Sequence, residues 1–355
     1  MRFENRKDGH SARPSVRRRR RVSKRLWMAG SLTLCAGLPA ASTYAAIGVT
    51  TTSNADALVT ELVGTGVTVV PGSATYTGAA NASGTFTGAG FLPFSSGIVL
   101  TTGDARTSAA PPPGLPDAFI IPGPNSSEGA GLDNGAAGDA DVAALAGATT
   151  FNASVLQFSF VPTTDTVRFQ LVFGSDEYLE FVGSGHTDTI AFMLNGKNIA
   201  LVPGTNSNIS VDTVHPAVNN GFGGGPQPAL NAQYFTGIPQ GDASTQLDGL
   251  VGAATSLFVQ GTVTPGQVNT IKVAIADATD SVIDSAVFLP TQGFAAVGAV
   301  PPVPPSPPSP PSPPSPPSPP SPPAAIPTPE AIWMGLSTLG SIGLLSKLRR
   351  RSGEK

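Results

Sequence analysis

Short apolar runs separated by turn-forming residues recur between residues 46 and 295. Residues 156–160 and 167–171 alternate apolar and polar side chains, which is the two-residue period of a strand buried on one face. Their polar members should face water or a sheet edge: Gln157, Ser159, Arg168 and Gln170. The apolar runs predict strands at 67–70, 97–101, 155–160, 166–173, 189–194, 257–263, 269–275 and 286–289.

Two short helices are expected within this β-rich pattern. Residues 54–62 begin with Asn54, a good N-cap residue, and place Leu58 and Leu62 four positions apart on one helix face. Residues 141–146 form a second, shorter candidate.

Many strands, few helices and no alternation of strand with helix favour an all-β fold. We therefore predict a single β-sandwich, jelly-roll-like, over residues 46–295. Residues 109–138 and 217–239 are rich in Gly, Pro and Asn and are expected to be long loops on this sandwich.

Charge separates the ends of the chain from its body. Of the 20 Lys and Arg residues, 11 lie in residues 1–45 and five in 347–355. Residues 46–295 contain the remaining four basic residues and 19 acidic ones. This body therefore has a net charge of about −15, which the whole-chain value of −3 does not show. Such an acidic body would repel phosphate, which excludes nucleic acid as a partner.

The N-terminal residues 1–45 have the features of a secretory signal peptide. Basic residues 17–25 precede a short apolar run, 26–38, and small residues allow cleavage after Ala45. The one cysteine, Cys35, lies in that run. The mature protein would therefore contain neither a disulfide nor a thiolate metal site.

The C-terminal part combines a stalk with an anchor. Residues 296–326 are a Pro- and Ser-rich linker, which favours an extended polyproline II rod. Within 327–355, an apolar run at 332–348 has about the 17-residue minimum for a membrane helix. The basic residues that follow predict a cytoplasmic C-terminus with the body outside.

This order of motif, apolar helix and basic end resembles the PEP-CTERM sorting signal. The motif here is Pro329-Glu330-Ala331, which lacks the second proline of that signal. The resemblance implies processing by an exosortase-type enzyme; otherwise the helix is a permanent membrane anchor.

Three segments of the body resemble the choice-of-anchor L domain of bacterial surface proteins. They are Gly84–Gly88 with Ser96–Gly103, Val172–Phe181 leading to Asp188–Gly196, and Ile275–Phe288. Together they span most of residues 50–290. The resemblance implies an extracellular domain joined to an anchor, and it supplies no reaction.

Carboxylates crowd two of these segments. Asp176, Glu177 and Asp188 belong to the second, and Asp277, Asp280 and Asp284 to the third. Dense like charges repel one another unless a cation or hydrogen-bond donors neutralise them. Hard oxygen ligands suit Ca²⁺, whereas zinc would need the absent thiols or more than the two body histidines, His186 and His215. The alternative is that these acids cap strands and solubilise the surface.

A catalytic role is the weaker interpretation. Glu177 as acid and Asp188 as base could serve a secreted glycan hydrolase. We expect instead an exported, non-catalytic structural or adhesive module at the cell surface or in the extracellular matrix. Its sharper form is a Ca²⁺-dependent or polysaccharide-binding adhesin.

Overall fold

The computed structural model describes residues 46–107, 120–125, 130–221 and 225–298. All of them belong to one compact unit, residues 1–302. The signal peptide, most of the linker and the C-terminal apolar run lie outside the described residues, so those assignments stay predictions. Within the described residues no helix has the length and apolar character to cross a membrane.

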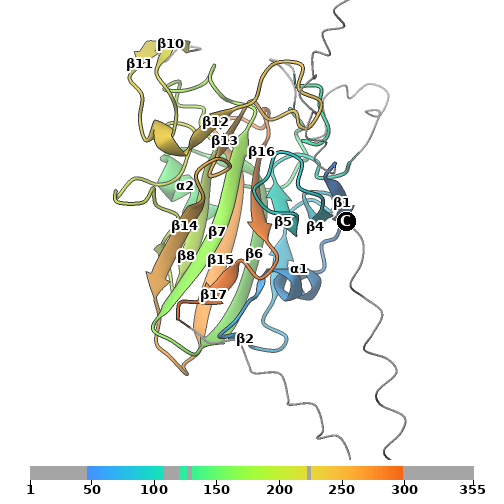
Figure 1. Cartoon of the computed structure of the whole chain (residues 1–355), viewed down its shortest axis with the longest axis vertical. Coiled ribbons are helices and arrows are strands. Elements are labelled where there is room, and N and C mark those ends of the chain that lie inside the picture. Colours follow the sequence, from blue (N-terminus) through green and yellow to red (C-terminus); the bar gives the residue numbers. More distant parts are fainter. Residues whose placement is uncertain (1–45, 108–119, 126–129, 222–224, 299–355) are drawn as a thin grey trace, which may run out of the picture. The chain divides into compact units, whose positions relative to one another are not determined.

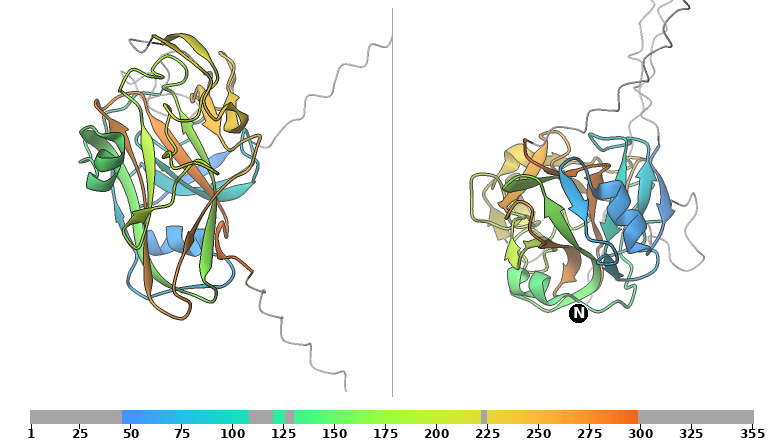
Figure 2. Two further views of the ribbon diagram at one scale, coloured as in Figure 1. Left: turned by 90° about the vertical axis from the view of Figure 1, so that its left-hand side faces the viewer. Right: turned by 90° about the horizontal axis from the view of Figure 1, so that it is seen from below.

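Two antiparallel sheets face each other across an apolar core (Figures 1 and 2). The nine-stranded sheet comprises β1 (Gly48–Thr51), β4 (Ser83–Thr87), β5 (Ser96–Thr101), β7 (Thr166–Ser175), β12 (Phe235–Gly237), β13 (Gly249–Val251), β14 (Leu257–Thr262), β16 (Ser285–Pro290) and β17 (Phe294–Ala296). The six-stranded sheet comprises β2 (Val67–Val69), β3 (Thr75–Thr77), β6 (Thr150–Pro162), β8 (Thr189–Leu194), β9 (Lys197–Asn198) and β15 (Asn269–Ala278). This architecture confirms the predicted all-β class.

The described residues also contain two α-helices, α1 (Ala55–Leu62) and α2 (Ala140–Ala146). The Asn54 side chain accepts the backbone N–H of Ala57, as expected for an N-cap. Leu58 and Leu62 of α1 enter the core between the sheets, whereas α2 packs on the outer face of the six-stranded sheet.

Every strand predicted from an apolar run is present, but the loop predicted at 217–239 is only partly a loop. It holds a hairpin of β10 (Val218–Gly221) and β11 (Gly225–Gln227), a 3₁₀ turn (Ala232–Tyr234) and β12. These short strands pair through their backbones and have no alternating apolar side chains, so periodicity could not reveal them.

The core between the sheets is dominated by aromatic residues. Phe169 of β7 stacks on Phe294 of β17, with ring centroids 4.1 Å apart. Phe169 also contacts Phe192 of the opposite sheet edge to face. Phe294 is fully buried and touches two further rings, those of Phe158 and Phe160. The short β17 is thus held by one aromatic side chain at the centre of the sandwich.

A second apolar layer covers the other face of the nine-stranded sheet near the end of β7. It includes Val172, Leu250 and Phe288 from the sheet, and Ile120 and Ile121 from the segment 120–125. This part of the sheet is therefore buried on both faces, which explains why β5 and β16 are apolar at successive positions.

Replacing Phe294 with Ala should remove the central aromatic contact and leave a cavity, lowering the free energy of unfolding by about 3–5 kcal/mol. Denaturant unfolding of the full chain measures this. Val268, which is 63% exposed, provides the control, since Val268→Ala should change stability little. Equal effects of both substitutions would contradict the assigned core.

Candidate functional site

The register of the nine-stranded sheet places three carboxylates side by side. Ser175, the last residue of β7, pairs with β13 on one side and with β16 on the other. Asp176 follows it and therefore lies between Asp248, just before β13, and Asp284, just before β16. The Asp176 N–H donates to the Asp284 carbonyl at 3.1 Å, and the Asp248 N–H to the Ser175 carbonyl at 3.1 Å.

The six-stranded sheet supplies two more acids at the same end of the sandwich. Its β8–β15 register sets Asp188, just before β8, beside Asp277 of β15. The Ala278 N–H donates to Asp188 Oδ1 at 3.0 Å. Glu177, which follows Asp176, joins the two sheets because its Oε2 accepts the Asp188 N–H at 2.7 Å.

We call these six residues the acid cluster: Asp176, Glu177, Asp188, Asp248, Asp277 and Asp284. Each is buried, with at most 8% of its surface exposed. Among the described residues, the ion pairs involve other acids: Arg106 pairs with Asp104, and Lys272 with Asp139 and Asp141. The cluster is therefore a concentration of buried like charge that no side-chain cation neutralises within the described part of the chain.

Hydrogen-bond donors reach only some of the carboxylate oxygens. Backbone N–H groups in 130–132 donate to Oδ2 of Asp176 and of Asp284, at 2.8 and 3.1 Å. The Asn152 side chain donates to Asp277 Oδ2 at 2.9 Å. Several buried oxygens have no hydrogen-bond partner: Oδ1 of Asp176, Asp277 and Asp284, and Oδ2 of Asp188 and Asp248.

Burial raises the pKa of these carboxyls. Removal from water, followed by repulsion from Asp248, raises the pKa of Asp176 to about 9. Desolvation likewise raises the pKa of Asp188 to about 7 and that of Asp248 to about 7. The pKa values of Glu177 and Asp277 are also well above normal, through burial and then repulsion from Asp188. A proton or a metal cation must therefore accompany the folded cluster.

The loop after β5 closes directly over the cluster. A Cβ on Gly103 would lie 2.1 Å from Asp284 Oδ2, so only glycine allows this approach. The neighbouring Asp104 is 2% exposed and is bound by the Arg106 guanidinium. The glycine therefore sets how tightly the chain covers the carboxylate.

Five of the six acids singled out from the sequence lie in the cluster. The sixth, Asp280, is partly exposed, and its Oδ1 accepts the Val282 N–H at 3.2 Å. Sequence reasoning missed Asp248. Asp248 could have been found from its position directly before an apolar strand, because Asp188 and Asp284 occupy the same position relative to β8 and β16.

The acids do not form a closed metal centre on their own. Within the described ranges, no group of three or more His, Cys, Asp or Glu side chains has the spacing to hold an ion. An ion here would need amide, backbone carbonyl or water oxygens as well, which Ca²⁺ accepts among its six to eight ligands.

Burial also bears on the hydrolase alternative. Glu177 and Asp188 are 3% and 1% exposed, and Glu177 is hydrogen-bonded to the backbone of Asp188. A glycosidic acid–base pair must flank its substrate from both sides. The Glu177 side chain instead contacts the Asp188 backbone inside the domain.

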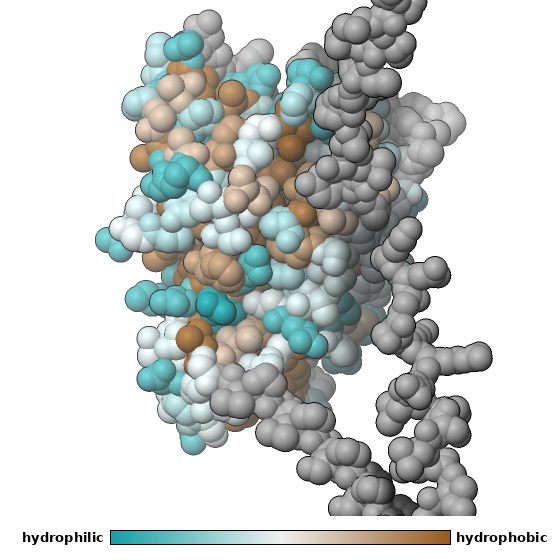
Figure 3. Space-filling model, in the orientation of Figure 1, coloured by the Kyte–Doolittle hydropathy of each residue, from teal (hydrophilic) through white to brown (hydrophobic). Residues whose placement is uncertain are grey.

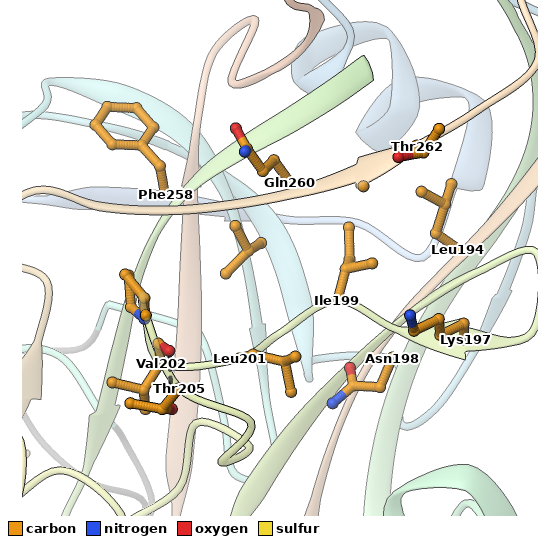
Figure 4. Close-up of a pocket in the computed structure, with 14 residues that line it drawn as sticks. Leu194, Lys197, Asn198, Ile199, Leu201, Val202, Thr205, Phe258, Gln260 and Thr262 are labelled. Atoms are coloured by element: carbon orange, nitrogen blue, oxygen red, sulfur yellow. Dashed lines mark hydrogen bonds between the residues drawn. The ribbon is translucent and has the colours of Figure 1, made fainter. Parts of the chain in front are cut away.

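A separate groove of about 590 Å³ runs along β14, between that strand and residues 197–205 (Figure 4). Phe258, Val259 and Gln260 all line this groove. Val259 is buried, whereas Phe258 and Gln260 alternate with it along β14 and are exposed (Figure 4). The groove is lined by none of the acid cluster.

We predict that the chelated protein loses stability as pH rises. Its buried carboxyls have folded-state pKa values above the unfolded values, so the folded state holds protons that the unfolded state has released. Their contribution is complete below about pH 4 and is lost as pH rises through 7 to 9. Melting temperatures in EDTA should fall between pH 5 and pH 8.5; a rise over this range would contradict the burial of these groups.

Comparisons with known proteins agree with the resemblance noted in the motifs. The family model of the choice-of-anchor L domain matches residues 47–295, which includes all of the acid cluster. The searches of curated proteins and of solved structures each gave no match. Because the family model covers most of the chain, the protein belongs to the choice-of-anchor L domain family and is an exported protein anchored at the cell surface.

Proposed function

We propose that this protein is a non-catalytic structural or adhesive module of the cell surface or extracellular matrix, displayed on its Pro-rich segment, and that Ca²⁺ stabilises it. Residues 327–355 would connect it to the membrane, at least until an exosortase-type enzyme processes them. The glycan hydrolase remains the alternative, and the burial of Glu177 and Asp188 weighs against it.

The observation that supports Ca²⁺ is the set of buried oxygens without donors. Asp188 Oδ2, Asp277 Oδ1 and Asp284 Oδ1 belong to residues that are at most 1% exposed. Burial is the main cause of the raised pKa of both Asp277 and Asp284, and repulsion from Asp188 adds to it, so the three carboxyls interact. We call these three the inner acid group. A divalent cation held by one or two of these carboxylates together with amide, backbone carbonyl or water oxygens would replace repulsion by attraction. Without a cation, the carboxyls would have to keep their protons at neutral pH.

Calcium added to EDTA-treated protein should raise the melting temperature. At a free concentration 100 times Kd, binding to the folded state alone adds about 2.7 kcal/mol of stability. Asp277→Asn should reduce this rise yet stabilise the protein in EDTA, because an amide is neutral without taking up a proton on folding. Asp165→Asn, at an exposed position, is the matched control. Unchanged melting in Ca²⁺ would refute the proposed dependence.

The adhesive part of the proposal rests on the outer face of β14 and β7. Phe258 lies opposite Gln170, and Gln260 opposite Arg168. The Arg168 guanidinium carbon lies 4.8 Å from the centroid of the Phe258 ring, which is 40% exposed. We call these four residues the β14 face. Figure 3, which views this side of the molecule, shows polar and apolar residues intermingled there.

Such a surface has the parts that a polysaccharide contact needs. The aromatic ring offers an apolar platform with polar neighbours, and the two amides and the guanidinium can hydrogen-bond hydroxyl and carboxylate groups. The body carries a net charge of about −15, which disfavours an anionic glycan and makes a neutral polysaccharide the expected ligand.

Phe258→Ala should therefore abolish retention of the full chain on immobilised dextran, a neutral polysaccharide, while leaving its melting temperature nearly unchanged. Val268→Ala, which trims another exposed apolar side chain, should bind like the unaltered protein. Retention on hyaluronate, an anionic uronic acid polymer, should be weaker. Equal retention of both variants on dextran would remove the β14 face as the contact.

A further inference from the structure

Strand β14 lies at an open edge of the nine-stranded sheet. All of its residues, Leu257–Thr262, pair with β7 in an unbroken antiparallel register, and no other described strand pairs with β14. The other strands at the margins of the two large sheets are shorter: β1 has four residues, and β2, β3, β9, β12 and β17 have two or three. Proteins commonly protect a sheet edge by keeping it short or by placing proline, lysine or a bulge on it. Strand β14 has none of these protections.

The pairing with β7 determines which backbone groups of β14 are free. The N–H of Val263, directly after β14, donates to the Asp165 carbonyl at 2.9 Å. Because hydrogen-bonded pairs alternate along an antiparallel ladder, the odd-numbered residues of β14 bond to β7. Strand β17, on the other side of β7, agrees with this alternation, since the Val297 N–H donates to the carbonyl of the even-numbered Thr166. Three residues of β14 therefore direct their N–H and C=O groups to the free edge: Phe258, Gln260 and Thr262.

This free edge opens into the groove between β14 and residues 197–205 (Figure 4). Phe258, Gln260 and Thr262 all line the groove. Within the described residues, their backbone N–H and C=O groups have no hydrogen-bond partner. An extended polypeptide carries N–H and C=O groups with the same alternation, so it is the ligand that such an edge matches.

A second copy of β14 is complementary to this edge. A two-fold axis perpendicular to the sheet makes the two strands antiparallel. With that axis beside Gln260, this residue lies opposite its own copy, and Phe258 lies opposite Thr262 of the second copy. Each residue with free backbone groups then meets another such residue in a hydrogen-bonded pair, so the free groups of both strands are used.

Charge permits this contact although the body is acidic. Strand β14 has no charged residue, and among the residues of β7 that pair with it, Thr166–Leu171, only Arg168 is charged. In the joined sheets, Arg168 and its copy would be three strand spacings apart, about 14 Å. This separation exceeds the screening length of about 8 Å at physiological ionic strength. Neither β14 nor its paired residues carry a carboxylate that would repel the second copy.

We infer that two copies of this protein associate edge to edge through β14, which joins their nine-stranded sheets. This contact goes beyond the proposed function because it requires neither Ca²⁺ nor a glycan. It would place the two β14 faces on one continuous sheet. Two weak contacts with the same polysaccharide would then reinforce each other.

Cysteine cross-linking of the full chain in detergent tests this pairing, with Cys35→Ser first removing the one native cysteine. Gln260→Cys should form a disulfide-linked dimer under mild oxidation, because residues of a hydrogen-bonded pair have Cα atoms about 5.5 Å apart, within disulfide range. Thr262→Cys is the matched control. It is exposed on the same side of β14, but its copy would lie about 14 Å away along the strand and should not cross-link.

Mixing the Phe258→Cys and Thr262→Cys chains should give a mixed disulfide dimer, although neither variant cross-links with itself. This mixed pair tests the same register if Gln260→Cys does not fold. A folded Gln260→Cys chain that stays without a cross-link would overturn the inference, as would a mixed pair that forms none. Equal cross-linking of Gln260→Cys and Thr262→Cys would also overturn it, because random collision would then explain both. No glycan or calcium enters the experiment, so its failure would leave the proposed function standing.

Discussion

The burial of six carboxylates where the two sheets end is the constraint on which the rest of this domain depends. Strand register leaves no freedom in their placement, because Ser175 pairs with β13 and β16 at once. Loops then adapt to the acids: residues 130–132 direct their N–H groups at Asp176 and Asp284. Residue 103 is a glycine, since any side chain there would collide with the same Asp284. Without a neutralising cation or proton, these loops would cover a repulsive surface.

Apolar residues cover both faces of the nine-stranded sheet near the end of β7, which increases the cost of burying charged carboxylates there. Ile120 and Ile121 cover the outer face near the end of β7, while the aromatic core fills the inner face. Water is therefore excluded from both sides of the strands that carry Asp176 and Asp284. Desolvation is accordingly the largest cause of the raised pKa of each.

The sequence revealed those parts of the fold that have a strong local signal. Apolar runs located the long strands, and Asn54 marked the start of α1. It did not reveal β12 and β13, three-residue strands whose pairing is a property of the assembled sheet.

The acid cluster divides in the same way. Asp277 and Asp284 were recognisable because acids crowd their segment. Asp248 has no acidic neighbour in sequence and joins the cluster only through the β7–β13 register.

The same cluster answers how an exported domain can hold its loops without disulfides. The one cysteine of the chain lies at position 35, before the folded body. A Ca²⁺ ion bound by residues distant in sequence would hold long loops together, as a disulfide does. It would stabilise the folded state, because the unfolded chain lacks the assembled site. Extracellular modules bind Ca²⁺ with dissociation constants of about 10⁻⁴ to 10⁻³ M. A modest affinity for Ca²⁺ would therefore suffice outside the cell. If the chain binds Ca²⁺ only after export, it reaches its full stability at the cell surface.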